Sequence, residues 1–233
     1  MYFLGIDTST KTCSTAVTKD DFLVTETTLC NSLSHSKKLL SLIDDTLEKA
    51  GIDIHQIDSI AVSTGPGSFT GLRIGIGTVK GLCLAAPKPI IGVSTLEALS
   101  CPVSDHSSLI CPLLDARKKE VYTSLFRYKN NRLTRLSEDM VISPLELLKK
   151  IDEKTVFIGE GAEVYRNMIT EKLSDRAVFL PKFFNQPRGV CVAKMGMMKY
   201  REGEISGLHD LKPAYIRRSE AEIKWEEKKK KTF

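Results

Sequence analysis

The stretch Gly65–Gly81, GPGSFTGLRIGIGTVKG, decides how this chain can fold, because six of its seventeen residues are glycine. It follows a strand-like apolar run, residues 57–64, and leads into a helix-like run, LCLAA. A glycine-rich turn between a strand and a helix is typical of a phosphate-binding loop. This segment nevertheless fails both common patterns. Val79 stands where a Walker A loop needs a glycine before its lysine, and Lys80 replaces the third glycine of a dinucleotide fingerprint.

Four glycines fall inside the predicted helix, at positions 71, 75, 77 and 81. Each glycine in a helix interior costs about 1 kcal/mol relative to alanine. Glycine offsets that cost where another backbone has to approach closely, and each of the pairs 71/75 and 77/81 has the four-residue spacing that aligns small residues on one helix face. We therefore predict that this helix is pressed against another element on at least one side. Its first turn, Ser68–Thr70, also offers unpaired backbone N–H groups that attract an anion.

The composition is ordinary for a globular protein, with 42% hydrophobic and 27% charged residues among 233. The longest apolar run, residues 72–86, is interrupted by Arg73 and Lys80 and is too short to span a membrane. The N-terminus lacks the pattern of a secretory signal, so we expect a cytoplasmic protein with no membrane contact. The six cysteines form no C-x-x-C motif, which argues against a cysteine metal site and fits reduced thiols.

The order of strand-like and helix-like segments predicts two α/β lobes. Each half of the chain reads as a meander of strands followed by alternating helices and strands, and the sequence turns polar near residues 104–108. We expect an N-terminal lobe at residues 1–105, a C-terminal lobe at 106–218 and a basic tail at 219–233. From Arg217 to the end, seven basic residues outnumber four acidic ones, so residues 217–233 supply +3 of the formal charge of +5.

Three residues are candidates for catalytic or metal-binding groups. Asp7 ends a strand in GIDTST, where it is either a Mg²⁺ or phosphate contact or a turn former that binds its own backbone. Asp115, in LLDARKKEVY, is either a catalytic carboxylate or part of a salt-bridged turn. His35 has Leu39 at the position where a second helical ligand would stand, and H-E-x-x-H is absent, so we expect no metal site.

Several segments together resemble the TsaB (YeaZ) family. They appear in the family's order from about Ile6 to Glu222, so the resemblance covers nearly the whole chain. The glycine segment alone is shared with the larger TsaD/Kae1 relatives, whereas DARKKEVY and PAYIRR point to TsaB. The segments are IDTST, HSKKLLSLI, GPGSFTGLRIG, IGVSTLEALS, LLDARKKEVY, GEGAEVY and PAYIRRSEAE.

The resemblance implies an α/β fold of the actin, sugar-kinase and Hsp70 type (ASKHA), with two related lobes. It also implies a part in making N6-threonylcarbamoyladenosine (t6A) at position 37 of tRNA. In that system TsaD transfers the threonylcarbamoyl group, TsaB is a truncated relative that binds TsaD and keeps it active, and TsaE is an ATPase that joins them. We expect no tightly bound cofactor, ATP or ADP at the junction with TsaD, tRNA contact mainly through the complex, and a homodimer when TsaD is absent.

Catalytic parts that the resemblance would lead us to look for are missing. A TsaD metal site needs two histidines on the first long helix, and this chain has only His35 there. An actin-like ATPase needs a second phosphate loop of the D-x-G-[GT] kind, and here Ala116 and Arg117 follow Asp115. We therefore expect a subunit that is not itself an enzyme and that docks on TsaD.

The expected docking surface is an exposed apolar ridge on the helices at residues 34–50 and 70–86. Its candidate contacts are His35, Leu39, Leu42, Ile43, Thr46, Leu72, Arg73, Ile76 and Val79. Some of these side chains must face the chain's own core, and the sequence does not decide which. The candidate nucleotide contacts are Asp7, Gly65, Pro66, Gly67, Ser68, Phe69, Thr70 and Gly71.

Three other functions were considered. A small ASKHA-type kinase or ATPase would act alone through Asp7 and the turn at residues 65–70. An RNA-binding module would act through Lys228–Lys231. A metallopeptidase, which the older glycoprotease label of such chains suggests, would need a bound metal.

Overall fold

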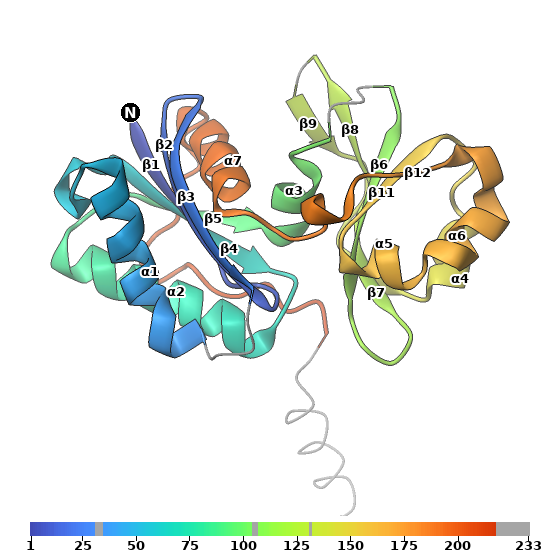
Figure 1. Ribbon diagram of the computed structural model, residues 1–233, viewed down its shortest axis with the longest axis horizontal. Coiled ribbons are helices and arrows are strands. Elements are labelled where there is room, and N and C mark those ends of the chain that lie inside the picture. The colour runs from blue at the N-terminus through green and yellow to red at the C-terminus, as the bar shows by residue number, and fades with distance from the viewer. Residues whose placement is uncertain (31–34, 104–106, 131, 218–233) are drawn as a thin grey trace, which may run out of the picture.

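The computed structural model describes residues 1–30, 35–103, 107–130 and 132–217, which form two lobes, each built around one β-sheet (Figure 1). The strands of the first lobe are β1 (Tyr2–Asp7), β2 (Thr12–Lys19), β3 (Phe22–Cys30), β4 (Ser59–Gly65) and β5 (Ile90–Ser94). Its helices are α1 (His35–Ala50), α2 (Phe69–Ala85) and α7 (Gly189–Arg201), with a 3-10 turn at Ile54–Gln56. Helix α3 (Thr95–Ser100) packs against elements of both lobes.

The first sheet has the order β3-β2-β1-β4-β5. Strand β1 pairs antiparallel with β2 and parallel with β4, so β1 lies at its centre. Side chains alternate between the two faces of a strand, and in β1 this alternation separates two cores. Leu4 packs in the core that contains residues of α1 and α2, while Phe3 packs in the core that contains residues of α7. The sheet is therefore covered by helices on both faces.

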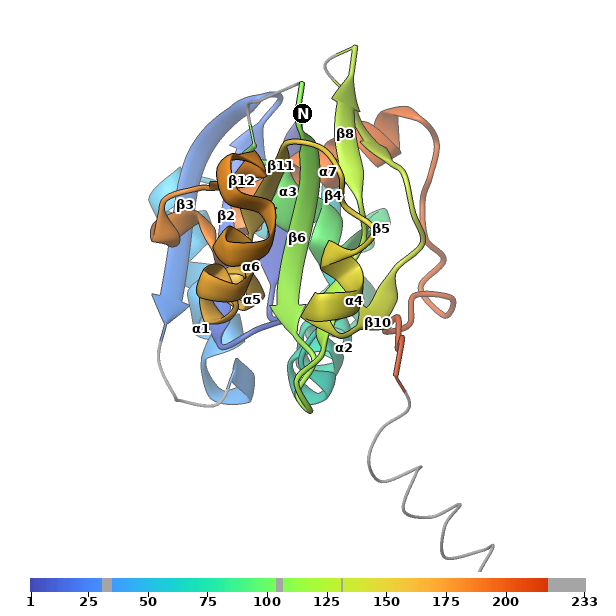
Figure 2. The same cartoon turned by 90° about the vertical axis from the view of Figure 1, so that its right-hand side faces the viewer.

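The second sheet has the order β10-β7-β6-β11-β12, with β8 pairing to β6 and β9. Its helices α4, α5 and α6 lie on one face, in front of β6 in Figure 2. The strands are β6 (Leu109–Asp115), β7 (Val121–Thr123), β8 (Phe126–Lys129), β9 (Arg132–Arg135), β10 (Met140–Ile142), β11 (Thr155–Ile158) and β12 (Ala177–Phe179). The helices are α4 (Pro144–Leu148), α5 (Glu160–Val164) and α6 (Arg166–Leu173), with 3-10 turns at Ser174–Arg176 and Lys182–Phe184.

Helix α7 belongs to the first lobe and not, as predicted, to the second. The sequence assigns residues 106–218 to the second lobe, but α7 packs against β1, β2, β4 and β5 of the first sheet. The close approach is possible because Gly5 of β1 faces the backbone of Gly189 and Ala193. Glu26 of β3 then holds the start of the helix, since its carboxylate accepts hydrogen bonds from the Arg188 side chain and the Val190 amide.

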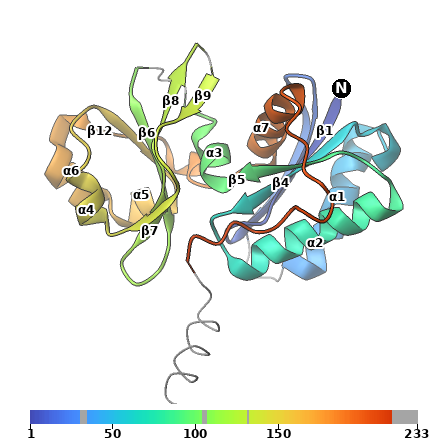
Figure 3. The same cartoon turned by 180° about the vertical axis from the view of Figure 1, so that it is seen from behind.

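The predicted boundary at residues 105/106 and the tail at 219–233 lie outside the described residues, so these two predictions stand as they were made. After α7 the chain runs along the first lobe past α2 and β4 and reaches the second lobe, as Figure 3 shows from behind. Leu211 of this returning segment packs in the core of the first lobe, and residues 214–217 reach the space between the lobes.

Candidate functional site

A cavity of about 370 Å³ lies between the lobes, where the first turn of α2 faces the β6–β7 turn. This volume is at the lower end of the range for ligand pockets. Of the predicted nucleotide contacts, Pro66, Gly67, Ser68 and Phe69 line this cavity, whereas Asp7, Gly65, Thr70 and Gly71 do not. The full lining comprises Ser9, Thr10, Lys11, Pro66, Gly67, Ser68, Phe69, Leu114, Asp115, Ala116, Arg117, Tyr122, Glu160, Ala214, Tyr215, Ile216 and Arg217.

The Asp7 carboxylate is buried and turned into its own lobe. It accepts hydrogen bonds from the backbone N–H and the hydroxyl of Ser9, each at 3.0 Å, and a further short one from the hydroxyl of Ser63. The residue has no exposed surface. Of the two roles that the sequence left open for Asp7, the structure supports the turn former, which ties the end of β1 to β4.

The backbone at the start of α2 is also engaged within the first lobe. The Ser68 amide donates to the carbonyl of Ser9 at 2.7 Å, and the Gly71 amide donates to the Ser68 hydroxyl at 3.2 Å. A Cβ atom at Gly71 would stand 2.0 Å from the carbonyl oxygen of Thr8, and one at Gly75 would stand 2.4 Å from the Thr8 hydroxyl. The predicted close packing of α2 is thus confirmed at these two glycines, and the element that approaches is the turn after β1.

The β6–β7 turn forms the opposite wall and has an unusual backbone. Arg117, Lys118 and Lys119 have φ angles of +62°, +54° and +61°, the left-handed region that favours glycine. Such residues cost roughly 1–3 kcal/mol each and persist only where the surroundings hold them. Here the Asp115 carboxylate accepts a hydrogen bond from the Arg117 amide at 2.8 Å, which fixes the start of the turn. Asp115 therefore shapes a turn that carries three cations.

Residues 213–217, the described part of the PAYIRR motif, form a strap, and residues 214–217 of it line the cavity. The Ala214 amide donates to the carbonyl of Thr64 at 2.7 Å in the first lobe. Tyr215 stacks on Phe69 with ring centroids 4.8 Å apart, and its hydroxyl accepts a hydrogen bond from Arg73. At the far end, Arg217 donates to the carbonyl of Ala116 in the second lobe at 2.8 Å and pairs with Glu120. The strap thereby links the two lobes.

Sequence reasoning missed the strap residues as part of the site. PAYIRR served only to indicate the family, because neither its spacing nor its composition indicates where the segment returns. Tyr122 was also missed, because nothing in its local sequence indicates that it lines the cavity. Burial, together with the nearby negative charge of Asp115, raises the pKa of Tyr122.

The cavity does not fit a Mg²⁺-nucleotide held in the manner of an actin-like ATPase. The carboxylate that would face the metal is that of Asp7, and it already accepts hydrogen bonds from the hydroxyls of Ser9 and Ser63. The Ser68 amide already donates to the backbone carbonyl of Ser9. In the second lobe, Arg217 occupies the carbonyl of Ala116. Next to the Asp7 cluster, burial and the charge of Asp7 raise the pKa of the Cys13 thiol to about 12, so Cys13 does not serve as a thiolate.

The prediction of an exposed ridge on α1 and α2 is wrong for seven of its nine residues. These seven are at most 4% exposed and pack in the first lobe's own core. The reason is that the apolar face of an amphipathic helix covers its own sheet, so helical spacing selects core residues first. Arg73 is exposed, and the side chain of His35 lies outside what the structure describes. The seven are Leu39, Leu42, Ile43, Thr46, Leu72, Ile76 and Val79.

The outer faces of α1 and α2 present a different set of residues. Leu40 is 59% exposed and Leu84 is 73% exposed. On α2, Gly77 and Gly81 face open space, because a Cβ atom at either position would meet nothing within 4 Å. We call Leu40, Gly77, Gly81 and Leu84 the outer face.

A groove of about 660 Å³ lies beside the outer face, between α1 and the Leu82 side of α2. Its floor is apolar and its rim carries Asp44, Glu48 and Asp53. The remaining lining residues are Leu40, Ser41, Ile43, Leu47, Ile52, Ile54 and Leu82.

Within residues 1–30, 35–103, 107–130 and 132–217 there is no group of three or more His, Cys, Asp or Glu side chains that could hold a metal ion. Across the same ranges, none of the helices combines the length and the apolar character needed to cross a bilayer.

Comparisons with known proteins show the family and the fold. The family model of TsaD, the tRNA N6-adenosine threonylcarbamoyltransferase, matches residues 30–225. The tRNA threonylcarbamoyladenosine biosynthesis protein TsaB of Bacillus subtilis is 33% identical, over 99% of this chain and 100% of its own length. A Pseudomonas aeruginosa crystal structure, of an uncharacterized protein with similarity to peptidase YeaZ, superposes with a TM-score of 0.81 at 27% identity, covering 93% of this chain and 99% of that one.

A more distant structure shows the fold alone. The activator of 2-hydroxyisocaproyl-CoA dehydratase from Clostridium difficile superposes with a TM-score of 0.54 at 10% identity, over 88% of this chain and 97% of its own. The two-sheet architecture therefore belongs to the actin-like ATPase (ASKHA) class, as the resemblance implied. Within that class, the chain belongs to the TsaB family of tRNA threonylcarbamoyladenosine biosynthesis proteins.

Proposed function

We propose that this chain is a non-catalytic subunit of the t6A-synthesis complex and that it binds and activates a TsaD-type threonylcarbamoyltransferase. The observation that carries the proposal is the open pair Gly77 and Gly81 on the outer face of α2. Each glycine in a helix interior lowers helix stability by about 1 kcal/mol relative to alanine. No close contact inside the fold offsets this cost at Gly77 or Gly81. A second backbone that packs against this stripe would explain both.

The surroundings of the glycine pair suit a protein partner. Leu84 follows the glycine pair on α2 and is exposed, Leu40 is exposed on α1, and the groove between α1 and α2 that Leu40 lines offers depth for a partner side chain. The acidic rim of Asp44, Glu48 and Asp53 favours a partner whose own rim carries Lys or Arg. Because the partner is a relative with the same glycine helix, we place the contact between equivalent α1–α2 faces. The same face pairs two copies of this chain when the transferase is absent.

The state of the cleft supports the non-catalytic part of the proposal. Asp7 is held by Ser9 and Ser63, and the strap joins the two walls through Arg217. Chemistry in the complex then belongs to the transferase, together with a TsaE-type ATPase, and tRNA contact comes mainly through the assembled complex. ATP or ADP at the junction with the transferase and a cytoplasmic location remain parts of this proposal.

The test combines binding with reconstituted modification of tRNA. Leu84→Glu and Leu40→Glu place charges on the outer face, whereas Leu145→Glu makes the same change on α4, where Leu145 is 44% exposed. We expect the first two variants to keep the melting temperature, to lose co-purification with the transferase and to lower t6A formation at least tenfold. Leu145→Glu should behave as wild type. Undiminished modification without this chain, or with both outer-face variants, would contradict the proposal.

The alternative is a small ASKHA-type kinase or ATPase that acts alone. It predicts nucleotide hydrolysis by the purified chain that Asp7→Asn removes. Because the Asp7 carboxylate is enclosed by serine donors, we expect hydrolysis by the isolated chain to stay at background.

A further inference from the structure

Arg73 lies on the same side of α2 as the outer-face residues of that helix. Residues four and eight positions apart in an α-helix lie near one another on one face, so Arg73, Gly77 and Gly81 follow one line along α2. Leu84 continues this line, because the eleven residues from 73 to 84 make about three turns. All four residues are exposed. A transferase that covers the outer face therefore comes to lie next to Arg73.

The side chain of Arg73 connects α2 with the strap. Its Nε atom donates a hydrogen bond to the hydroxyl of Tyr215 at 2.9 Å. Its guanidinium carbon lies 3.8 Å from the centre of the Phe69 ring, and Tyr215 stacks on that ring with 25° between the two ring planes. Phe69 and Tyr215 both line the inter-lobe cavity. Arg73 thus joins the outer face of α2 to residues of the cavity.

The strap is anchored in both lobes, and the two anchors are close together in the sequence. The Ala214 amide donates to the Thr64 carbonyl in the first lobe. Arg217 donates to the Ala116 carbonyl in the second lobe. The three residues that follow Ala214 span at most about 10 Å even when fully extended. A displacement of Tyr215, which lies between the anchors, is therefore passed on to Arg217.

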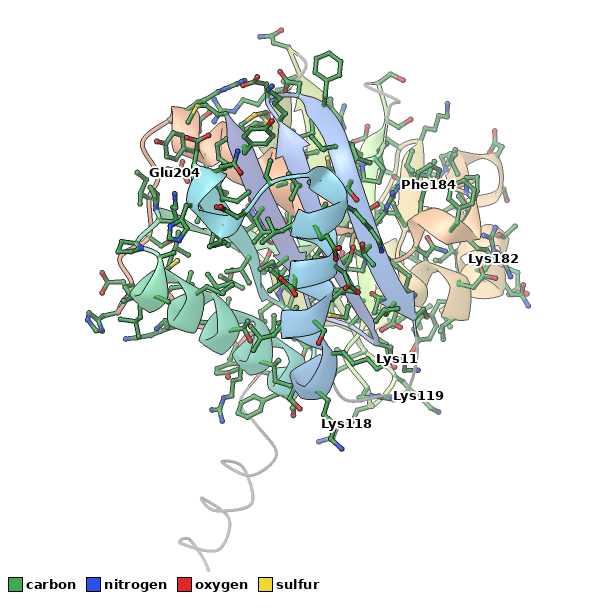
Figure 4. All side chains as sticks on the ribbon, turned by 60° about the vertical axis from the view of Figure 1, so that its left-hand side comes forward. Lys11, Lys118, Lys119, Lys182, Phe184 and Glu204 are labelled. Carbon is green, nitrogen blue, oxygen red and sulfur yellow. The ribbon has the colours of Figure 1, made fainter. Side chains whose placement is uncertain are left out.

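The anchor in the second lobe lies at the base of the β6–β7 turn, which forms one wall of the cavity. Figure 4 shows Lys118 and Lys119 of this turn at the same edge of the molecule as Lys11 of the first lobe. Because Arg217 is bonded to Ala116 at the start of the turn, the position of the strap sets how this wall stands relative to the first lobe.

We propose that the strap couples the docking of the transferase on α2 to the position of the second lobe. The Arg73–Tyr215 hydrogen bond is the link between them. In the free chain this bond is exposed, and water competes for both of its partners. A transferase on the outer face excludes water from Arg73, and a hydrogen bond becomes stronger where the local dielectric is low. Docking therefore holds the strap against α2 and, through Arg217, holds the cavity wall.

This coupling gives the second lobe a part in the complex, although docking takes place on the first lobe. The inference rests on the proposed function for the place where the transferase docks. Linkage is reciprocal, so a closed strap favours docking by the same factor by which docking favours the closed strap. Loss of the Arg73–Tyr215 bond should therefore weaken docking modestly and remove the effect of docking on the strap.

The experiment removes the hydroxyl of Tyr215 and leaves its ring. Tyr215→Phe keeps the stacking on Phe69 and removes the acceptor of the Arg73 hydrogen bond. The matched control is Tyr165→Phe, which removes a tyrosine hydroxyl between α5 and α6 of the second lobe. Both proteins keep the full chain. Calorimetry gives the affinity for the transferase, and hydrogen–deuterium exchange at the Ala214 amide is then measured for the free chain and for the complex.

For the wild-type chain, we expect exchange at the Ala214 amide to slow by about fivefold or more on docking. Tyr215→Phe should keep the melting temperature, bind the transferase with at most about tenfold lower affinity, and show no slowing on docking. In the free Tyr215→Phe chain, the Ala214 amide should exchange faster than in wild type, because the strap has lost a hold on α2. The control should behave as wild type in all of these measurements.

Equal slowing in Tyr215→Phe and wild type would overturn the inference, and so would the absence of slowing in a wild-type chain that binds the transferase. Both results leave the proposed function intact. Equal exchange of the two free chains would also overturn the inference, since Arg73 would then not hold the strap. Complete loss of binding in Tyr215→Phe would assign Tyr215 to the docking contact itself, against the inference. A wild-type chain that does not bind the transferase would contradict the proposed function and, with it, the inference.

Discussion

The two glycine pairs of α2 have the same spacing in the sequence and opposite surroundings in the structure. Gly71 and Gly75 are pressed against Thr8, where a Cβ atom would overlap existing atoms. Gly77 and Gly81 face open space. The first pair is required by the fold, because the turn after β1 could not otherwise approach α2. The second pair is not, and its helix cost of about 1 kcal/mol per glycine points to a contact outside the chain.

The largest expected effect on the free energy of unfolding comes from comparing Leu39 and Leu40, two adjacent residues on opposite faces of α1. Leu39 is 1% exposed and Leu40 is 59% exposed. Leu39→Glu buries an unpaired charge and should destabilise the first lobe by more than about 4 kcal/mol, enough to prevent folding. Leu40→Glu should change stability by less than about 0.5 kcal/mol. Denaturant unfolding measures both, and similar losses for the two would remove the distinction between inner and outer face.

The next effect compares the glycine pairs directly. Gly71→Ala sets a methyl group 2.0 Å from the Thr8 carbonyl oxygen, and we expect a loss of about 3 kcal/mol or more in the free energy of unfolding. Equilibrium unfolding in urea gives this quantity. If Gly71→Ala were as stable as wild type, the close approach of the β1 turn to α2 would be absent in solution.

A smaller loss is expected for Asp7→Asn. The amide cannot accept all the hydrogen bonds that Ser9 and Ser63 donate to the carboxylate, which leaves a buried donor without a partner. This should cost about 1–3 kcal/mol in the free energy of unfolding. Thermal and urea unfolding measure it. A variant with native stability that lost only nucleotide hydrolysis would support the kinase alternative instead.

The smallest change has the opposite sign. Gly77→Ala with Gly81→Ala should raise the free energy of unfolding by about 1 kcal/mol per site, since alanine favours the helix and meets no neighbour. The same double variant should bind the transferase more weakly, because two methyl groups hold the partner's backbone away. Unfolding and titration calorimetry on one preparation test both parts. Stabilisation together with wild-type affinity would leave the exposed glycines without a role.

Much of the fold could be predicted from the sequence, because local patterns carry it. The apolar run YFLGID predicts a strand, and the helical spacing of Leu39, Leu40, Ile43 and Leu47 up to Gly51 predicts a helix; the structure has both. The tight packing of α2 followed from its glycines. The run EVYTSLFRY reads as one strand in the sequence, but it divides into β7 and β8, which pair with different parts of β6.

The docking surface and the strap were beyond the same reasoning, for physical reasons. Apolar spacing in α1 and α2 identified Leu39 and Ile76, which the sheet needs. The spacing of Gly77 and Gly81 is the same as that of the inward glycine pair, so the sequence does not tell which pair faces outward. The return of α7 to the first sheet and of residues 214–217 to the cavity depends on contacts between segments far apart in the sequence. Neither leaves a local signal in the sequence.

The most direct test of the central claim is photo-crosslinking from the outer face. A photoreactive amino acid replaces Leu84, which is 73% exposed on α2. A control chain carries the same amino acid in place of Val164, the last residue of α5, which is 66% exposed. Both are mixed with the TsaD-type transferase and irradiated. The account predicts a covalent adduct with the transferase from position 84 and none from position 164. A complex that forms normally but crosslinks only from position 164, or from neither position, would contradict it.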